Sequence, residues 1–246
     1  MKMILCNGFL CWLLVLISCD VQERQAELKR IAKYKLEIAE PSSLCYSYST
    51  GYFVIACDKT DRVYFTARDG KVIRYFDTKA KDAEGAVQLK SDSSIWLVDE
   101  RKREALHYTS DGDYIDEAEI PVEERKSNHG PEGITFNPEK QEFYIVNEQQ
   151  PRMLLLLDLN MKLKEAIPLD FARDFSDLFY EEESNSLWLL SELSKRLYQC
   201  DLRGNLKKTY RFDMNGAEGV VVDSKNKMVY LVSDGNQALY EYQLED

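Results

Sequence analysis

Five short apolar runs, rich in β-branched and aromatic residues, recur along this chain and predict buried β-strands. They occupy residues 52–55, 95–98, 143–146, 187–190 and 228–232. Polar turn residues bound each run, for example Ser49-Thr50-Gly51 and Glu183-Ser184-Asn185-Ser186. A continuous apolar run of this length fits either a strand buried on both faces or a buried piece of helix. The turn residues at both ends favour β-hairpins.

Another strand is predicted after each of these runs. These strands occupy residues 62–65, 105–108, 153–157, 196–200 and 238–242. Turns such as Arg68-Asp69-Gly70-Lys71 follow, and their Asp-Gly pairs supply the positive φ that tight hairpins need. In four of the five units an outer strand comes next, for example at residues 72–76 and 207–212.

A short phrase opens each unit. Its five copies are Pro41-Ser42-Ser43-Leu44, Ala83-Glu84-Gly85-Ala86, Pro131-Glu132-Gly133-Ile134, Phe175-Ser176-Asp177-Leu178 and Ala217-Glu218-Gly219-Val220. The second residues of successive copies lie 42 to 48 positions apart. A period of roughly 40–50 residues is typical of propellers and solenoids. With four strands per unit, the sequence predicts an all-β fold, a five-bladed β-propeller.

The fifth unit reaches Asp246 after only three strands, so its fourth strand has to come from elsewhere. Residues 34–39 alternate apolar and polar side chains and are predicted to supply it. A blade built from both termini closes the ring and leaves only short, protected sheet edges. A degenerate sixth blade within residues 117–130 is the alternative.

The N-terminus has the features of a secretory signal peptide over residues 1–18. Lys2 precedes a mostly apolar run that is too short to span a bilayer comfortably. The run ends in Leu16-Ile17-Ser18-Cys19, which resembles a lipobox and so implies a diacylglycerol on Cys19. An ordinary signal peptide and an uncleaved anchor are the alternatives. We expect lipid attachment at Cys19, a tether or short helix over residues 19–33, and the propeller over residues 34–246.

The net charge narrows the classes of partner that the protein can bind. The formal net charge is −11, and no run of Lys or Arg offsets it, which argues against nucleic acid and against adsorption to anionic lipid as binding partners.

Besides Cys19, the predicted mature chain has Cys45, Cys57 and Cys200, an odd number. A hairpin centred near residue 50 places Cys45 opposite Ile55. We expect three small buried residues and no disulfide framework.

Two series of polar residues recur at constant phase. The opening phrases place Glu84, Glu132 and Glu218 at one point of three units, with Ser42 and Ser176 at that point of the others. A second series lies 16 residues after these positions, at Asp58, Glu100, Glu148, Glu192 and Asp234. The first strand of each propeller blade lines the central channel, so both series are expected at one mouth of it.

Several carboxylates that converge on one axis repel one another unless a cation, a proton or a hydrogen-bond donor intervenes. Calcium binds clusters of oxygen ligands, and Glu84, Glu132, Glu218 and Glu148 are the candidate ligands. The competing interpretation is structural, with each acid accepting hydrogen bonds from backbone N–H groups of a neighbouring turn. Recurrence of an acid in all five units favours this second interpretation.

Other catalytic chemistry has less support. The chain contains two histidines, His107 and His129, and neither CxxC nor HExxH, which argues against zinc. His129 precedes the third unit and is a candidate general base for a metal-dependent hydrolase. No GxSxG, P-loop or GxGxxG motif is present, and no residue is assigned as catalytic.

The ordered set of opening phrases, together with Val146-Asn147-Glu148-Gln149-Gln150-Pro151, resembles the SdiA-regulated family of bacterial envelope propellers. That family is distantly similar to NHL-repeat and gluconolactonase-like propellers. The resemblance covers residues 34–246 and departs from the family at Ser42-Ser43, where the family usually has Ser-Gly. It implies a propeller outside the cytoplasm, anchored in the bacterial cell envelope. By analogy with the gluconolactonase-like relatives, it also implies a divalent metal held by channel-facing carboxylates, including one at Glu84.

Three functions are compatible with these observations. The first is a lipid-anchored module that binds an unknown protein or small-molecule ligand, with a calcium ion at the channel mouth as its only expected cofactor. The second is a metal-dependent esterase or lactonase. The third is a structural protein that binds a partner through its acidic rim.

Overall fold

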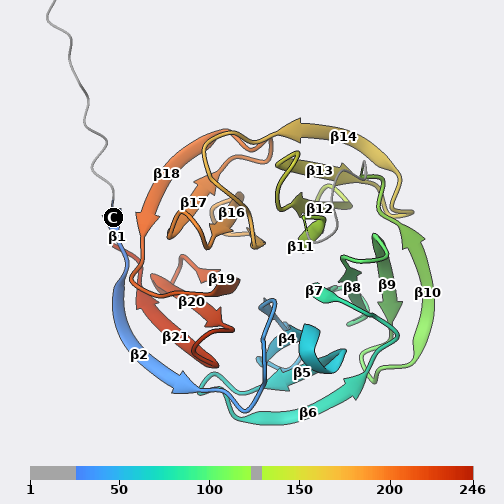
Figure 1. The fold of residues 1–246 in the computed structure, drawn as a ribbon, viewed down its shortest axis with the longest axis horizontal. Helices are drawn as coiled ribbons and strands as arrows, with labels where there is room; N and C mark the ends of the chain where they lie inside the picture. Colours follow the sequence, from blue (N-terminus) through green and yellow to red (C-terminus); the bar gives the residue numbers. More distant parts are fainter. Residues whose placement is uncertain (1–25, 123–128, 246) are drawn as a thin grey trace, which may run out of the picture.

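The computed structural model describes residues 26–122 and 129–245, which form a ring of five sheets around a central channel (Figure 1). Each sheet contains one blade. The four strands of blades 1 to 4 run in sequence order from the channel to the rim, whereas the outermost strand of blade 5 comes from the N-terminal part of the chain. The prediction of a five-bladed β-propeller is confirmed. In the described part of the chain the sixth-blade alternative is wrong, because residues 117–119 belong to the outer strand of blade 2.

Each blade contains four strands that follow one another from the channel outward. Blade 1 contains β3 (Cys45–Tyr46), β4 (Phe53–Cys57), β5 (Arg62–Thr66) and β6 (Val72–Asp77), with a short 3₁₀ helix η1 (Asp58–Thr60) after β4. Blade 2 contains β7 (Ala83–Gln88), β8 (Ile95–Asp99), β9 (Glu104–Tyr108) and β10 (Tyr114–Glu119). Blade 3 contains β11 (Pro131–Asn137), β12 (Glu142–Asn147), β13 (Met153–Leu157) and β14 (Leu163–Pro168). Blade 4 contains β15 (Asp177–Glu181), β16 (Ser186–Ser191), β17 (Arg196–Cys200) and β18 (Leu206–Arg211). Blade 5 contains β19 (Ala217–Asp223), β20 (Met228–Ser233), β21 (Ala238–Gln243) and β2 (Lys29–Lys35).

Burial changes from the channel to the rim, and the sequence pattern follows it. All residues of the second strands β4, β8 and β16 are buried, which explains their continuous apolar runs. Outer strands β6 and β10, at the rim in Figure 1, have mostly exposed or half-buried residues. An outer strand is packed on one side and therefore needs few apolar residues. A polar sequence at the rim is thus compatible with a regular sheet.

The strand that closes the ring lies earlier in the chain than predicted. Strand β2 pairs with β21 over Lys29–Lys35, not over residues 34–39. Strand β1 (Ala26–Glu27) precedes it and pairs in parallel with β18 of blade 4. Residues 26–33 were expected to belong to a tether or short helix, but most of them are strand. The sequence pattern did not reveal this, because an outer strand can be as polar as a linker. In the alternating segment 34–39, the apolar side chains of Leu36 and Ile38 are buried in the hydrophobic core.

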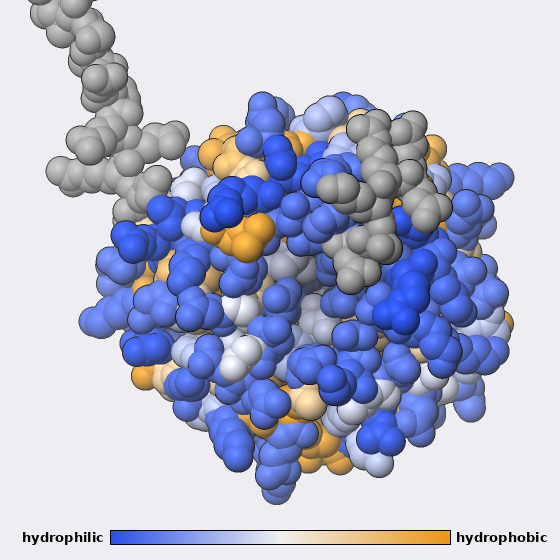
Figure 2. Space-filling model, in the orientation of Figure 1, coloured by the Kyte–Doolittle hydropathy of each residue, from blue (hydrophilic) through white to orange (hydrophobic). Residues whose placement is uncertain are grey.

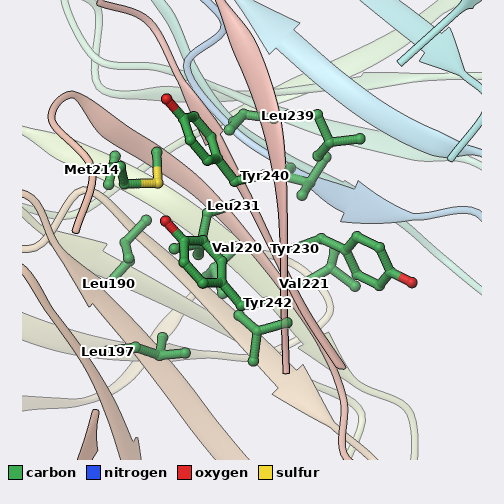
Figure 3. Packing of buried hydrophobic residues seen from close by; sticks show 14 of the residues in the cluster. Leu190, Leu197, Met214, Val220, Val221, Tyr230, Leu231, Leu239, Tyr240 and Tyr242 are labelled. Atoms are coloured by element: carbon green, nitrogen blue, oxygen red, sulfur yellow. The ribbon is translucent and has the colours of Figure 1, made fainter. Parts of the chain in front are cut away.

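The core lies between neighbouring blades. Figure 3 shows Tyr242 of β21 beside Leu190 and Leu197 of blade 4, with Tyr240 and Met214 of the same cluster to one side of them. Cys45, Cys57 and Cys200 are buried and free, as predicted. The register of the first hairpin differs by one residue, since Cys45 pairs with Val54 and not with Ile55. Among the described residues no helix is long and apolar enough to cross a membrane.

Candidate functional site

Glu84, Glu132 and Glu218 each occupy a β-bulge near the start of an inner strand. Ala83 and Gly85 pair with consecutive residues of β8, so that Glu84 is the extra residue of β7. The same one-residue shift occurs around Glu132 in β11 and around Glu218 in β19. A bulge bends its strand and redirects the side chain of the extra residue. All three glutamates are half-buried.

Glu132, Glu148 and Glu218 line one cavity of about 240 Å³ at this end of the channel. The other residues of its wall are Gln149, Asp174, Ser176, Glu192 and Leu193, and none of the described lining residues is basic. Figure 2 shows one face of the ring, which is mostly hydrophilic and hollowed near its centre. We call this end of the channel the acidic mouth. The structure thus brings together three of the four carboxylates that were predicted as calcium ligands.

Glu84 belongs to a second group of acids beside this cavity. Carboxylate oxygens of Asp58, Asp82 and Glu84 all lie within 4.8 Å of one another. Asp58 follows the second strand of blade 1, and the other two residues belong to the opening of blade 2. Arg101 pairs with Asp82 at 3.3 Å and partly balances the charge. The group therefore spans the junction between blades 1 and 2.

The acids of the second series lie at the junctions between neighbouring blades, and these junctions are of two kinds. Glu100 accepts a hydrogen bond from the Gly130 N–H group at 2.7 Å, and Glu192 accepts one from the Gly216 N–H group at 3.1 Å. In both cases the donor belongs to the segment that enters the next blade. At these two junctions the structural interpretation is correct.

At the other junctions the position of the donor glycine is occupied by an acid. Asp82 lies beside Asp58. Burial, then the charges of Glu192 and Glu40, raises the pKa of Asp234. Glu148 instead has His129 as a partner, with 3.0 Å between Oε2 and Nδ1. Neither Glu132 nor Glu218 accepts a backbone hydrogen bond from the described residues. For these glutamates the structural interpretation does not account for the charge.

The two serines of the opening phrases form hydrogen bonds with backbone groups, Ser176 with the next blade and Ser42 within its own blade. The Ser176 hydroxyl donates to the carbonyl oxygen of Ala217 in the next blade at 2.7 Å. The Ser42 hydroxyl accepts from the Asp58 N–H group at 3.2 Å. In place of the family's glycine, Ser43 is fully buried, and its hydroxyl accepts from the Ala56 N–H group at 3.2 Å. The departure at Ser42-Ser43 is thus accommodated by an added hydrogen bond.

Sequence reasoning missed Asp82 and Asp174. Asp82 lies two residues before Glu84, Asp174 two residues before Ser176, and Glu40 two residues before Ser42. A search for acids two residues before these positions of the opening phrases would have found them. Asp174 accepts bonds from the Ser191 hydroxyl and from the Leu193 N–H group, so it has partners of its own.

Burial and mutual repulsion raise the pKa values of several carboxyls at the acidic mouth. Burial, then the charges of Asp58 and Asp82, raises the pKa of Glu84 to about 8. Burial and the charge of Asp234 raise the pKa of Glu218 to about 9. Burial raises the pKa of Asp58 to about 6, and both a hydrogen bond to Asp82 and the charge of Asp82 add to the increase. Burial and the charge of Glu84 raise the pKa of Glu132 well above its usual value.

This donor set has a definite chemical preference. It consists of carboxylate and hydroxyl oxygens, which suit hard cations such as Ca²⁺ and not soft metals. A cation bound here would compensate the repulsion that raises the pKa values of these carboxyls. His129 is the one described imidazole near the cavity, through its contact with Glu148. Cys19, the predicted lipid attachment site, lies outside the described residues, as does the predicted signal peptide.

Solved structures of similar fold are distant in sequence. A streptogramin B lyase is 14% identical, with a TM-score of 0.51 over 87% of this chain and 73% of that chain. Virginiamycin B lyase from Staphylococcus aureus is also 14% identical, with a TM-score of 0.51 over 87% and 74% of the two chains. A protein of unknown function from Bacteroides caccae is 13% identical, with a TM-score of 0.56 over 78% and 70%. At such identities the likeness supports the propeller fold alone.

The sequence itself carries a more specific relationship. The family model described as SdiA-regulated matches residues 18–242, which is nearly the whole chain. This range includes all five opening phrases and every described blade. The resemblance inferred from those phrases is confirmed, and the chain belongs to the SdiA-regulated family.

Proposed function

We propose that this protein is a lipid-anchored binding module of the bacterial envelope, with a calcium ion at its acidic mouth. The observation that carries the metal site is the approach of the Asp58, Asp82 and Glu84 oxygens to within 4.8 Å of one another. Three carboxylates at this spacing match the oxygen-rich, flexible coordination that Ca²⁺ takes. Glu132, Glu148 and Glu218 line the adjoining cavity, where they supply further ligands or contact a bound partner.

Charge supports this assignment. The pKa values of Glu84 and Glu218 lie well above their usual value, so ionisation of these groups near neutral pH is unfavourable without a counter-charge. A divalent cation supplies that charge. The ligand or partner of the module would bind at the same mouth, since the described lining residues of the cavity are nearly all polar.

A calcium titration of the chain from residue 26 onward tests the metal site. We expect calcium to raise the melting temperature of the EDTA-treated protein at pH 8, and Glu84→Gln to abolish the increase. Glu132→Gln should weaken it. Glu139→Gln is the matched control, because Glu139 is exposed in the turn beyond the other end of β11 and should leave the increase unchanged. Absence of bound metal and of any calcium-dependent shift in the wild type would sink the calcium site.

The lipid anchor is tested separately on the full chain. Cys19→Ala should move the protein from the membrane fraction to the soluble fraction while the propeller stays folded. Membrane association that persists in the variant after signal cleavage contradicts the anchor. The result is independent of calcium, so the two parts of the proposal can fail separately.

A metal-dependent esterase or lactonase is the second candidate, favoured by one contact. His129 Nδ1 lies 3.0 Å from Glu148 Oε2, an arrangement in which the carboxylate orients the imidazole as a general base. Hydrolysis of p-nitrophenyl acetate and δ-gluconolactone should be measured with the calcium-loaded protein. Turnover that is lost in His129→Gln would favour the enzyme. Equal rates in the two proteins would favour the binding module.

A further inference from the structure

The opposite mouth of the channel contains a second cavity of about 240 Å³. It is lined from strands β3, β15 and β19 at the ends away from the opening phrases, by residues such as Tyr46, Phe179 and Val222. Strands β15 and β19 have five and seven residues. At about 3.3 Å per residue they separate the two mouths by roughly 15–25 Å. This cavity is therefore distinct from the acidic mouth.

Aromatic rings form the floor and one wall of this cavity. The Phe53 ring lies 4.9 Å from the Tyr230 ring and 6.2 Å from the Tyr46 ring, measured between centroids. Phe179 and Val221 complete the floor, and both are buried. Tyr48 at the edge is 43% exposed. A concave apolar surface with a few polar groups is the usual form of a small-molecule site.

Arg68 overlies these rings without an acidic partner. Its guanidinium donates to the Tyr46 hydroxyl at 3.3 Å and to the Tyr230 hydroxyl at 3.5 Å. The same group lies 5.5 Å and 5.9 Å from the centroids of the two rings. Within the described residues, Arg68 forms no ion pair, and neither does Lys225 on another side of the cavity.

Most of the acids of the cavity already have protein partners. Glu181 accepts bonds from the Ser184 N–H group and from the Ser224 hydroxyl, both at 2.8 Å. Glu182 pairs with Lys90 at 3.1 Å. Asp223 accepts from the backbone and side chain of Asn226, and Glu183 is exposed at the edge. The cavity wall therefore contains charges of both signs, and Arg68 and Lys225 are its two described cations without an ion pair.

A smaller recess beside the cavity contains a further unpaired polar atom. Gln88 is 5% exposed and lines this recess together with Tyr46 and Tyr48. Its Nε2 donates to the Ser93 carbonyl at 2.9 Å, whereas its Oε1 has no partner among the described residues. A buried acceptor without a partner is unfavourable, so a donor from a ligand or a water is expected there.

We propose that this cavity binds a small amphipathic carboxylate. Its ring or short acyl portion packs against Phe53, Tyr46 and Tyr230, and its carboxylate accepts hydrogen bonds from the Arg68 guanidinium. Arginine suits this role because its fork of N–H groups matches a carboxylate and because it stacks on aromatic faces. Arg68 already lies over the Tyr46 and Tyr230 rings, so a cationic ligand would meet a like charge there. The site needs no metal and stands apart from the proposed calcium site.

Phenylacetate is a probe that tests this proposal, with phenylacetamide and 2-phenylethylamine as its neutral and cationic counterparts. Binding is measured by calorimetry or by ligand-observed NMR on the folded protein, with and without EDTA. We expect phenylacetate to bind at least tenfold more tightly than either counterpart, whether or not EDTA is present. Arg68→Met should weaken phenylacetate binding by about tenfold or more, since a hydrogen bond to a charged group contributes about 1.5–3 kcal/mol.

Arg74→Met is the matched control. Arg74 also stacks on an aromatic ring, with its guanidinium 3.5 Å from the Phe65 centroid, but it lies outside the cavity. Its replacement should leave the affinity unchanged. Arg68→Lys keeps the positive charge but lacks the planar pair of N–H donors, so it should lose part of the affinity for phenylacetate. This variant tests the proposal if Arg68→Met does not fold. No saturable binding of phenylacetate, equal affinity for the acid and the amide, or equal losses in both methionine variants would overturn the proposal.

Discussion

The backbone carbonyl oxygen of Glu132 lies against Gly85, in the space that a side chain would need. A Cβ atom on Gly85 would sit 2.2 Å from this oxygen, well inside van der Waals contact. The two residues belong to inner strands β7 and β11 of neighbouring blades. The Glu-Gly phrase therefore combines an acid that faces the channel with a glycine that lets the next blade approach.

Gly85→Ala should destabilise the propeller by about 2–3 kcal/mol, because the added methyl group forces two backbones apart. Urea unfolding at pH 7 measures the change. Gly235→Ala is the control, since a Cβ atom there would meet no atom within 4 Å and should change stability little. Similar losses in both variants would show that the contact between blades 2 and 3 is not the cause.

Stability should fall as pH rises when no cation is present. The unfolded chain releases the proton of Glu84 near 4.5, whereas the folded protein retains it up to about 8. A carboxyl whose pKa is raised by folding favours the native state at low pH and loses this contribution as pH rises through the folded pKa. Glu218 extends the window to about 9. Melting temperatures in EDTA should therefore decrease from pH 5 to pH 9.

Glu132→Gln supplies the control for this pH dependence. The variant removes one charge from the group, so its stability should decrease less between pH 5 and pH 9 than that of the wild type. Calcium should reduce the wild-type decrease as well, if it binds as proposed. A stability that is constant or increases over this range would contradict the raised pKa values.

Glu100→Ala should lower the free energy of unfolding by about 1–3 kcal/mol, because it leaves a buried N–H group without an acceptor. The donor is the Gly130 N–H group, at 2.7 Å from the carboxylate. Glu100→Gln retains an acceptor oxygen and should cost less than half as much in urea unfolding. If both variants lose the same stability, the charge of Glu100 matters and the hydrogen bond does not.

Removal of strand β2 should open the ring. A chain that starts at Ala26 keeps the pairing of Lys29–Lys35 with β21, whereas a chain that starts at Leu36 exposes that edge. We expect the shorter chain to melt roughly 10 °C lower or to aggregate, since each kcal/mol shifts the melting temperature of such a domain by about 2–4 °C. Circular dichroism measures both. Equal melting temperatures would place the closing strand elsewhere.

The sequence by itself determined the strands, the five-fold repeat and the phase of two acidic series. These features are local, because apolar runs and turn residues specify a hairpin without reference to the rest of the chain. The family followed from the order of the opening phrases, and the burial of Cys45, Cys57 and Cys200 from residue type.

Only the tertiary structure decided what depends on contacts between blades. It placed the closing strand at Lys29–Lys35, because a polar rim strand cannot be told from a linker by its pattern. It showed which acids accept backbone hydrogen bonds and which meet other acids, since that depends on the residue opposite, as with Asp82 beside Asp58. The aromatic cavity under Arg68 has no signal in the sequence, because its walls come from blades far apart along the chain.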